Sequence, residues 1–202
     1  MDSALGGARR KSYRPLYLLI AVCIAPVVAS YLAYFWWQPS GRVNYGDLIE
    51  PQRPVPALDL RQLDGTAMDF AALRGKWVMV TVDSASCDSD CRQRLWKMRQ
   101  VRLTQGKDSD RVERLWLVTD KEPLEILLMR EHEGAHFLRA DAGQLQQFLP
   151  LPAKAAEGAM VLADYIWLID PNGNLMLRWP KDADPSKMKR DLTKLLKVSQ
   201  IG

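Results

Sequence analysis

Apolar residues follow three patterns along this chain, and each pattern predicts a different kind of element. Residues 15–37 carry no charged side chain, and this stretch is long enough for a helix to cross the hydrocarbon core of a bilayer. Three short runs rich in apolar and β-branched residues are typical of buried strands, namely 77–82, 113–119 and 165–169. Three segments space their apolar residues as helices do, namely 92–105, 123–130 and 184–198. This alternation predicts an α/β fold with one N-terminal transmembrane helix.

Shorter segments complete the predicted domain. Residues 58–62 and 68–73 flank the turn Asp64-Gly65, as the two arms of a hairpin would. Further short elements are predicted as a strand at 136–139, a helix at 144–148, and a strand at 174–179 that pairs with 165–169 through the turn Asp170–Gly173. The predicted organisation is a basic tail at 1–14, an anchor at 15–37, a proline-rich linker at 38–56 and a folded domain at 57–202.

The apolar N-terminal stretch is interpreted as an uncleaved anchor. Its C-terminal end carries aromatic residues that favour the membrane interface, namely Tyr31, Tyr34, Trp36 and Trp37. A signal peptide, the alternative, would have a shorter apolar region ending in small residues. Basic residues precede the stretch, which predicts a cytoplasmic N-terminus. We therefore expect a single-pass protein of the inner (cytoplasmic) membrane with its C-terminal domain on the periplasmic side.

Charge and composition narrow the function classes. The chain has 202 residues, of which 48% are hydrophobic, so it can bury a core. Its formal net charge is +4. Residues 1–14 hold four basic residues and one acidic residue, a local charge of +3, which leaves +1 for all the rest. A nucleic-acid-binding domain would carry its positive charge on the folded part, so the sequence predicts no nucleic-acid partner.

Two of the three cysteines are the candidate functional residues. Cys87 and Cys91 lie between the strand at 77–82 and the helix that follows it. If Cys87 opens that helix, Cys91 lies one turn later with its Cα atom roughly 6 Å away, which permits a disulfide or joint binding of a soft ion such as Cu(I). A helix N-terminus favours the thiolate, whereas Asp88 and Asp90 oppose further negative charge. A purely structural disulfide would close too short a loop to stabilise much. Cys23, inside the anchor, is expected to be a packing residue.

The motifs around these cysteines resemble the Sco family. The resemblance rests on Leu73-Arg-Gly-Lys76, the strand into Cys-x-x-x-Cys, Trp116-Leu-Val-Thr119 and Tyr165-Ile-Trp-Leu-Ile-Asp-Pro-Asn-Gly173. Sco proteins are membrane-anchored and thioredoxin-like, and they insert copper into cytochrome c oxidase or reduce its cysteines beforehand. The resemblance implies a thioredoxin-like mixed sheet flanked by helices, with Cys87 and Cys91 as copper-binding or redox thiols. It also implies a respiratory oxidase subunit or another copper or thiol protein as partner, and no organic cofactor.

The sequence departs from the Sco pattern at two places. Family members have proline after each cysteine, and Asp88 and Arg92 stand there in this chain. The family's third copper ligand is a histidine shortly before the strand at 165–169, where this chain reads Met160-Val-Leu-Ala-Asp164. The thioether of Met160 is a candidate substitute, but the Asp164 carboxylate is too hard a ligand for Cu(I). The missing histidine shifts the expectation towards thiol–disulfide exchange.

The predicted function is therefore an exported thiol–disulfide or copper-handling factor in cytochrome c oxidase biogenesis, acting through Cys87 and Cys91. Two alternatives stay open. One is a non-catalytic assembly scaffold with the same fold, and the other is a pure copper carrier with a rearranged third ligand. Whether the protein is an enzyme, as a thiol–disulfide oxidoreductase would be, depends on which of these holds.

A second motif and several side chains receive simpler interpretations. His132-Glu-Gly-Ala-His136 matches the H-E-x-x-H zinc signature, with Glu157 at the spacing of a third ligand. Because Gly134 interrupts the helix that this motif needs, we expect a solvated helix end there instead. Trp77, Trp116 and Trp167 are expected in the core, and Trp96 in the core or at its rim. The basic residues of the cysteine helix are expected on its exposed face, namely Arg92, Arg94, Lys97 and Arg99.

Overall fold

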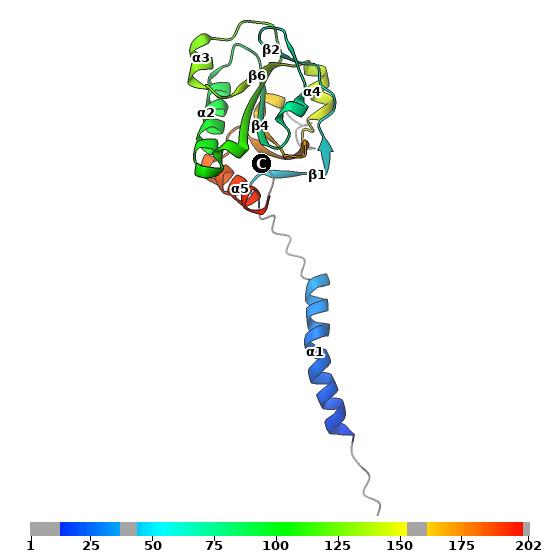
Figure 1. The fold of residues 1–202 in the computed structure, drawn as a ribbon. Coiled ribbons are helices and arrows are strands. Elements are labelled where there is room, and N and C mark those ends of the chain that lie inside the picture. Colours follow the sequence, from blue (N-terminus) through cyan, green and yellow to red (C-terminus); the bar gives the residue numbers. More distant parts are fainter. Residues whose placement is uncertain (1–12, 37–43, 153–160, 200–202) are drawn as a thin grey trace, which may run out of the picture. The chain divides into compact units, whose positions relative to one another are not determined.

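The computed structural model describes residues 13–36, 44–152 and 161–199. By its contacts the chain divides into two units, Met1–Val43 and Asn44–Gly202. The first contains the helix α1, Arg14–Trp36 (Figure 1). Its segment Arg14–Phe35 contains an 18-residue window with a mean hydropathy of 2.3 and is a candidate membrane span. This agrees with the predicted anchor at 15–37, of which Trp37 lies outside the described residues. The thiol of Cys23 is free and exposed on α1.

The second unit is built on a mixed sheet of eight strands in the order β1-β8-β7-β4-β5-β6-β2-β3. β4, the central strand, pairs parallel with β5 and antiparallel with β7. The strands are β1 Asp47–Pro54, β2 Leu60–Gln62, β3 Ala67–Met68, β4 Trp77–Asp83, β5 Val112–Val118, β6 His136–Arg139, β7 Tyr165–Ile169 and β8 Asn174–Pro180. The predicted strands at 77–82, 113–119, 136–139, 165–169 and 174–179 are thereby confirmed.

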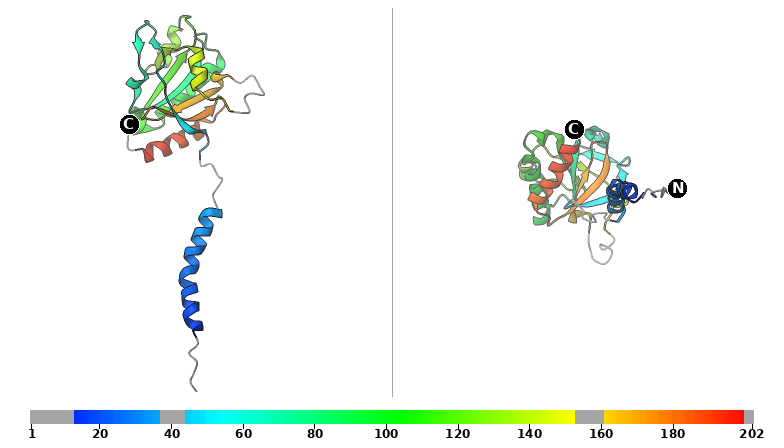
Figure 2. Two further views of the ribbon diagram at one scale, coloured as in Figure 1. Left: turned by 90° about the vertical axis from the view of Figure 1, so that its right-hand side faces the viewer. Right: turned by 90° about the horizontal axis from the view of Figure 1, so that it is seen from below.

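Helices cover both faces of this sheet (Figures 1 and 2). They are α2 Ser89–Leu103, α3 Ile126–Glu131, α4 Ala142–Phe148 and α5 Pro185–Val198, with short 3-10 turns at Phe70–Leu73, Gly106–Arg111 and Leu162–Asp164. α2 and α5 pack on the face of β4 that carries Trp77 and Met79. α4 packs with the opposite face, which carries Val78 and Val80. The fold is the predicted α/β arrangement.

The predicted linker at 38–56 is too long. Residues 47–54 form β1, an edge strand that pairs antiparallel with β8. An edge strand tolerates the prolines that made this segment look unstructured, because one side of its backbone needs no partner. The carboxylate of Asp191 on α5 also holds the start of this strand by accepting bonds from the backbone N–H groups of Tyr45 and Gly46, at 3.0 and 2.8 Å.

Two other boundaries differ from the prediction. β2 and β3 confirm the hairpin at Asp64-Gly65, but residues 70–73 form a 3-10 turn and no strand, because Asp69 caps the backbone N–H of Ala71. The helix predicted from Pro123 begins only at Ile126. Residues 121–125 stay extended or bent, and Leu124 is 8% exposed in the core beside the cysteines. Burying Leu124 in the core is therefore more favourable than forming a helical turn at residues 123–125.

The tryptophans predicted in the core are there. Trp77, Trp116 and Trp167 are 4%, 0% and 0% exposed. Trp116 points to the same face of β5 as Val118 and packs in a cluster with both cysteines. The core that supports the candidate site therefore lies between β5, α2 and the segment that leads into α3.

Candidate functional site

The cysteines lie where β4 passes into α2. Asp88 is the N-cap of α2, and its carboxylate accepts a hydrogen bond from the backbone N–H of Cys91 at 2.9 Å. Cys91 is the third residue of the helix. Cys87 precedes the cap and has a φ of 37°, a left-handed conformation that residues other than glycine rarely adopt. The expectation that Cys87 itself opens the helix is therefore wrong by two residues, because Asp88 is the better capping side chain.

The two cysteines form a disulfide with a Cα–Cα distance of 5.1 Å, within the usual range for such bonds. Cys87 is 2% exposed and Cys91 0%. Six apolar residues complete the cluster around them: Ala85, Leu95, Trp116, Val118, Leu124 and Leu128. The structure thus brings the two sequence-predicted residues together and buries both of them in the oxidised state.

The acidic residues between the cysteines are both engaged. Asp88 caps α2, whereas Asp90 pairs with the ammonium group of Lys181 at 3.0 Å. The same ammonium group contacts Asp164 at 2.9 Å. Hydrogen bonds from Lys181 to Asp164 and Asp90 raise the pKa of that lysine. Because Asp90 has a cation at hydrogen-bonding distance, it opposes a thiolate less than the sequence suggests.

Two of the four basic residues that were predicted on the exposed face of α2 are buried instead. Arg94 is 2% exposed and pairs with Asp83 at the end of β4. Lys97 is 5% exposed and donates to the carbonyl oxygen of Lys181 at 2.6 Å. Arg94 follows Cys91 by three residues and so shares its helix face. This three-residue spacing was the one sign in the sequence that Arg94 faces the core. A charged side chain is nevertheless expected on the protein surface unless its buried partner is known.

Asp83 is the buried partner that sequence reasoning missed. Burial raises the pKa of this carboxyl group, while bonds from the backbone N–H of Ser84 and the charge of Arg94 act in the opposite direction. Its Oδ1 accepts from the N–H of Ser84 at 2.7 Å. Asp83 therefore joins the end of β4, the loop that carries Cys87, and α2.

Arg92 lies on the outer side of the site. Its guanidinium pairs with Glu125, immediately before α3, and the two side chains are 43% and 48% exposed. Trp96, one turn further along α2, is 50% exposed, so it lies at the rim and outside the core. Glu125 was not singled out from the sequence, since its partner lies 33 residues away in the chain.

A comparison with protein-family models matches the part of the chain that carries both cysteines. The family model described as "Transmembrane-like, thioredoxin-like, C-terminal domain" matches residues 77–199, from β4 through α5. This chain belongs to the transmembrane-like, thioredoxin-like family. Both cysteines lie inside the matched region. No curated protein matches the chain in sequence.

Solved structures share the fold of this transmembrane-like, thioredoxin-like domain. Copper-bound yeast Sco1 is 15% identical with a TM-score of 0.56, covering 75% of this chain and 96% of its own. BsSco, described as a Sco-family cytochrome c oxidase assembly protein with a disulfide switch, is 12% identical with a TM-score of 0.56, covering 79% and 100%. Copper-bound ScoI of Bradyrhizobium japonicum is 19% identical with a TM-score of 0.50, covering 70% and 98%. The Sco resemblance is confirmed at the level of the fold.

The donor set around the cysteines does not supply a third copper ligand. Within residues 13–36, 44–152 and 161–199, no group of three or more His, Cys, Asp or Glu side chains is placed to hold a metal ion. Asp164, near the expected third-ligand position, is bound to Lys181. Met160 lies outside the described residues. Among the His, Cys, Asp and Glu side chains of the described residues, the two cysteine sulfur atoms are therefore the donors on offer, and only after reduction. The partly buried Met129 also packs against their cluster.

The H-E-x-x-H motif does not form a zinc site. His132 is the C-cap of α3, whereas His136 lies on β6 and contacts Glu113 at 3.4 Å. Gly134 between them has a φ of 77°, so the two histidines do not share a helix face. The helix end is confirmed, but it is not solvated at His132, which is 4% exposed. Glu157 lies outside the described residues.

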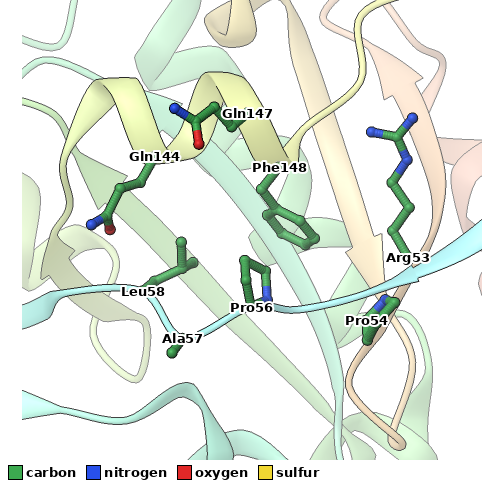
Figure 3. Close-up of a pocket in the computed structure, with 8 residues that line it drawn as sticks. All are labelled: Arg53, Pro54, Pro56, Ala57, Leu58, Gln144, Gln147 and Phe148. Atoms are coloured by element: carbon green, nitrogen blue, oxygen red, sulfur yellow. The ribbon is translucent and has the colours of Figure 1, made fainter.

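A pocket of about 450 Å³ lies elsewhere on the domain, between α4 and the chain that links β1 to β2 (Figure 3). Phe148, Pro56 and Leu58 contribute its apolar side. Phe148 belongs to the core on the opposite face of the sheet from the cysteines. Gln144 accepts a bond from the backbone N–H of Asp59 at 3.1 Å and so ties the two walls together.

Proposed function

We propose that this protein is a membrane-anchored thiol–disulfide exchange factor in cytochrome c oxidase biogenesis, with Cys87 and Cys91 as its reactive pair. The observation that carries the proposal is a disulfide formed across the first turn of α2, directly after the central strand, in a domain with the Sco fold. No third His, Cys, Asp or Glu side chain joins the pair among the described residues, which favours exchange over metal storage.

The chemistry of the pair follows from its position. In the reduced protein, the Cys87 thiolate attacks one sulfur of a partner's disulfide, and the partner's other sulfur leaves as a thiolate. The Cys91 thiolate then attacks Cys87 Sγ, which restores the Cys87–Cys91 bond and releases the partner as a dithiol. Two electrons pass to the partner, and an exported dithiol donor must return them. The N-terminus of α2 favours the thiolate form at Cys91 by its backbone N–H groups.

A copper carrier is the second candidate. Yeast Sco1 and the ScoI of Bradyrhizobium japonicum are copper-bound and have this fold, and two thiolates one helical turn apart suit Cu(I). Copper would be cargo held by Cys87 and Cys91, with Met160 or a group from the partner as the third donor. The scaffold, the remaining alternative, would keep the fold and need neither thiol.

The proposed location follows from the anchor. α1 would hold the protein in the inner membrane, with the basic cluster before it in the cytoplasm and the domain on the periplasmic side. A respiratory oxidase subunit, or another copper or thiol protein, would be the partner there. A tag on each terminus and protease protection in spheroplasts would report the orientation.

The deciding experiment compares the full chain with its Cys87→Ser, Cys91→Ser double variant. Cys23→Ser serves as the matched control, since this free thiol belongs to α1 and therefore to the other unit of the chain. We expect the double variant to lose oxidase assembly in cells and to lose reduction of a disulfide-bonded partner peptide, while the control retains both. Full assembly by the double variant would establish the scaffold. Stoichiometric Cu(I) binding by the reduced chain, without exchange, would establish the carrier.

A further inference from the structure

The burial of the disulfide conflicts with the reaction proposed for it. An attacking thiolate must reach a sulfur atom along the S–S axis, so exchange rates depend on access as well as on reactivity. Cys87 is 2% exposed and Cys91 0%. With the domain as described, no external thiolate reaches Cys87 Sγ, and some neighbouring group has to move first.

The neighbours of the disulfide differ in how firmly they are held. Trp116 and Val118 belong to β5, which pairs along its length with β4, and Leu95 belongs to the long helix α2. Leu124 and Leu128 come from the segment Asp120–Glu131, which contains only the six-residue helix α3. A helix this short has little stability of its own. This segment is therefore the part of the wall that moves at least cost.

A few polar contacts hold the segment Asp120–Glu131 closed. Glu125 pairs with Arg92 of α2. The carboxylate of Asp120 accepts a bond from the backbone N–H of Ala85 at 3.0 Å, two residues before Cys87. Arg139 of β6 donates to the carbonyl oxygen of Glu122 at 2.9 Å. The outer side of α3 adds little packing that would keep the segment closed, since Ile126 and Leu127 are 65% and 58% exposed.

We propose that the segment Asp120–Glu131 is a gate over the disulfide and that the Arg92–Glu125 ion pair is its latch. Opening lifts Leu124 and Leu128 away and exposes Cys87 Sγ. Gly134 provides a flexible end, because its φ of 77° suits glycine and the residue lies just beyond α3. The gate would make thiol–disulfide exchange depend on a partner that breaks the Arg92–Glu125 ion pair. This role of the gate rests on the proposed function.

The kinetics of reduction test the gate without any oxidase. The oxidised full chain in detergent micelles is mixed with increasing dithiothreitol. The reagent's first thiolate attacks Cys87, breaks the Cys87–Cys91 bond and displaces Cys91 as a thiolate, and its second thiolate then closes the reagent's ring and frees Cys87. Two electrons pass from the reagent to the cysteine pair. We expect slower reduction than in an oxidised peptide of residues 86–92, and a rate that reaches a plateau set by gate opening. A rate equal to that of the peptide and linear in reagent would overturn the gate.

Latch variants test the assignment of the ion pair. Arg92→Gln and Glu125→Gln should each speed reduction at low reagent about two- to fivefold, the effect of losing a partly exposed pair. The exchanged double variant Arg92→Glu, Glu125→Arg should return the rate towards the original. Arg61→Gln is the matched control, because Arg61 on β2 forms an exposed ion pair with Asp59, just before that strand, at 3.2 Å. Equal rates in all four variants would refute the latch.

A packing variant tests the gate independently of charge. Leu128→Ala removes a buried contact from the gate, and Leu145→Ala removes one of similar burial from α4 on the other face. We expect faster reduction only in Leu128→Ala when both are measured well below their unfolding transitions. An equal acceleration in both would assign access to global unfolding and overturn the gate. If the cysteine variants lose oxidase assembly but the reduction kinetics show no gate, the proposed function is retained and the gate is refuted.

Discussion

Arg94 and Asp83 form a buried ion pair that joins α2 to the end of the central strand β4. Arg94 lies one helical turn after Cys91, and its Nε also donates to the hydroxyl of Thr81 at 3.3 Å. The side chains of Arg94 and Asp83 are 3% and 16% exposed. This pair fixes the start of α2, and hence Cys91, against the end of the strand that leads into the Cys87 loop.

Replacing Arg94 with methionine should destabilise the domain strongly. The change keeps the aliphatic bulk but leaves the mostly buried Asp83 carboxylate without its cation, which costs about 3 kcal/mol. Urea unfolding of the full chain in micelles, followed by tryptophan fluorescence, measures the loss. The double variant Arg94→Met, Asp83→Val removes both charges and should recover most of it. A double variant as unstable as the sum of its single changes would show that the two residues act separately.

Acidification should destabilise the protein through His132. Burial and the nearby charge of Arg114 lower the pKa of His132 below its ordinary value of 6.5. Below pH 6.5 the unfolded chain therefore binds a proton that the folded chain does not, and stability falls until the pH reaches the folded pKa. The slope is at most about 1.4 kcal/mol per pH unit.

The substitution His132→Gln isolates this effect. Unfolding free energies of both proteins at pH 7.5 and pH 5.5 give the comparison. We expect the original chain to lose more stability on acidification than the variant, because the variant lacks the titrating group. Equal losses in both proteins would contradict the assignment.

Asp191 should be needed to hold the first strand of the domain. Its carboxylate accepts bonds from the N–H groups of Tyr45 and Gly46 and from Trp179 Nε1, the last at 3.1 Å. Asp191→Ala leaves these donors without a partner and should cost about 3 kcal/mol. Asp191→Asn keeps one acceptor and should cost less. Proteolysis within β1 and thermal unfolding measure both, with Asp182→Ala, an exposed acidic residue after β8, as the control that changes neither.

Reduction of the disulfide should leave the fold intact. The bond closes a loop of only five residues, so it removes about 2 kcal/mol of unfolded-chain entropy at most. The apolar cluster around the cysteines stays in place without it. Circular dichroism and urea unfolding with and without dithiothreitol test this. A reduced protein without native secondary structure would identify the bond as a structural staple.

Much of the fold could be predicted because its strongest signals are local. The buried strands β4, β5 and β7 are runs of apolar residues, and the Asp-Pro-Asn-Gly turn before β8 carries its own turn residues. The sequence prediction missed β1 because prolines are acceptable only in an edge strand, and the order of strands in the sheet decides which strand is at an edge. The start of α3 was misplaced because Leu124 is drawn into a core that forms between distant segments.

The sequence by itself determined the apolar N-terminal helix, the α/β fold and the spacing of the cysteine pair, since periodicity, composition and short spacing are properties of neighbouring residues. Only the tertiary structure decided that Arg94 and Lys97 are buried, that Lys181 reaches Asp90, and that Leu124 and Leu128 pack in one cluster with the cysteines. The physical reason is that the burial and position of a charged or apolar side chain depend on the group that it contacts in the folded protein. These partners lie 11 to 91 residues away along the chain and meet only when the sheet and its helices have packed.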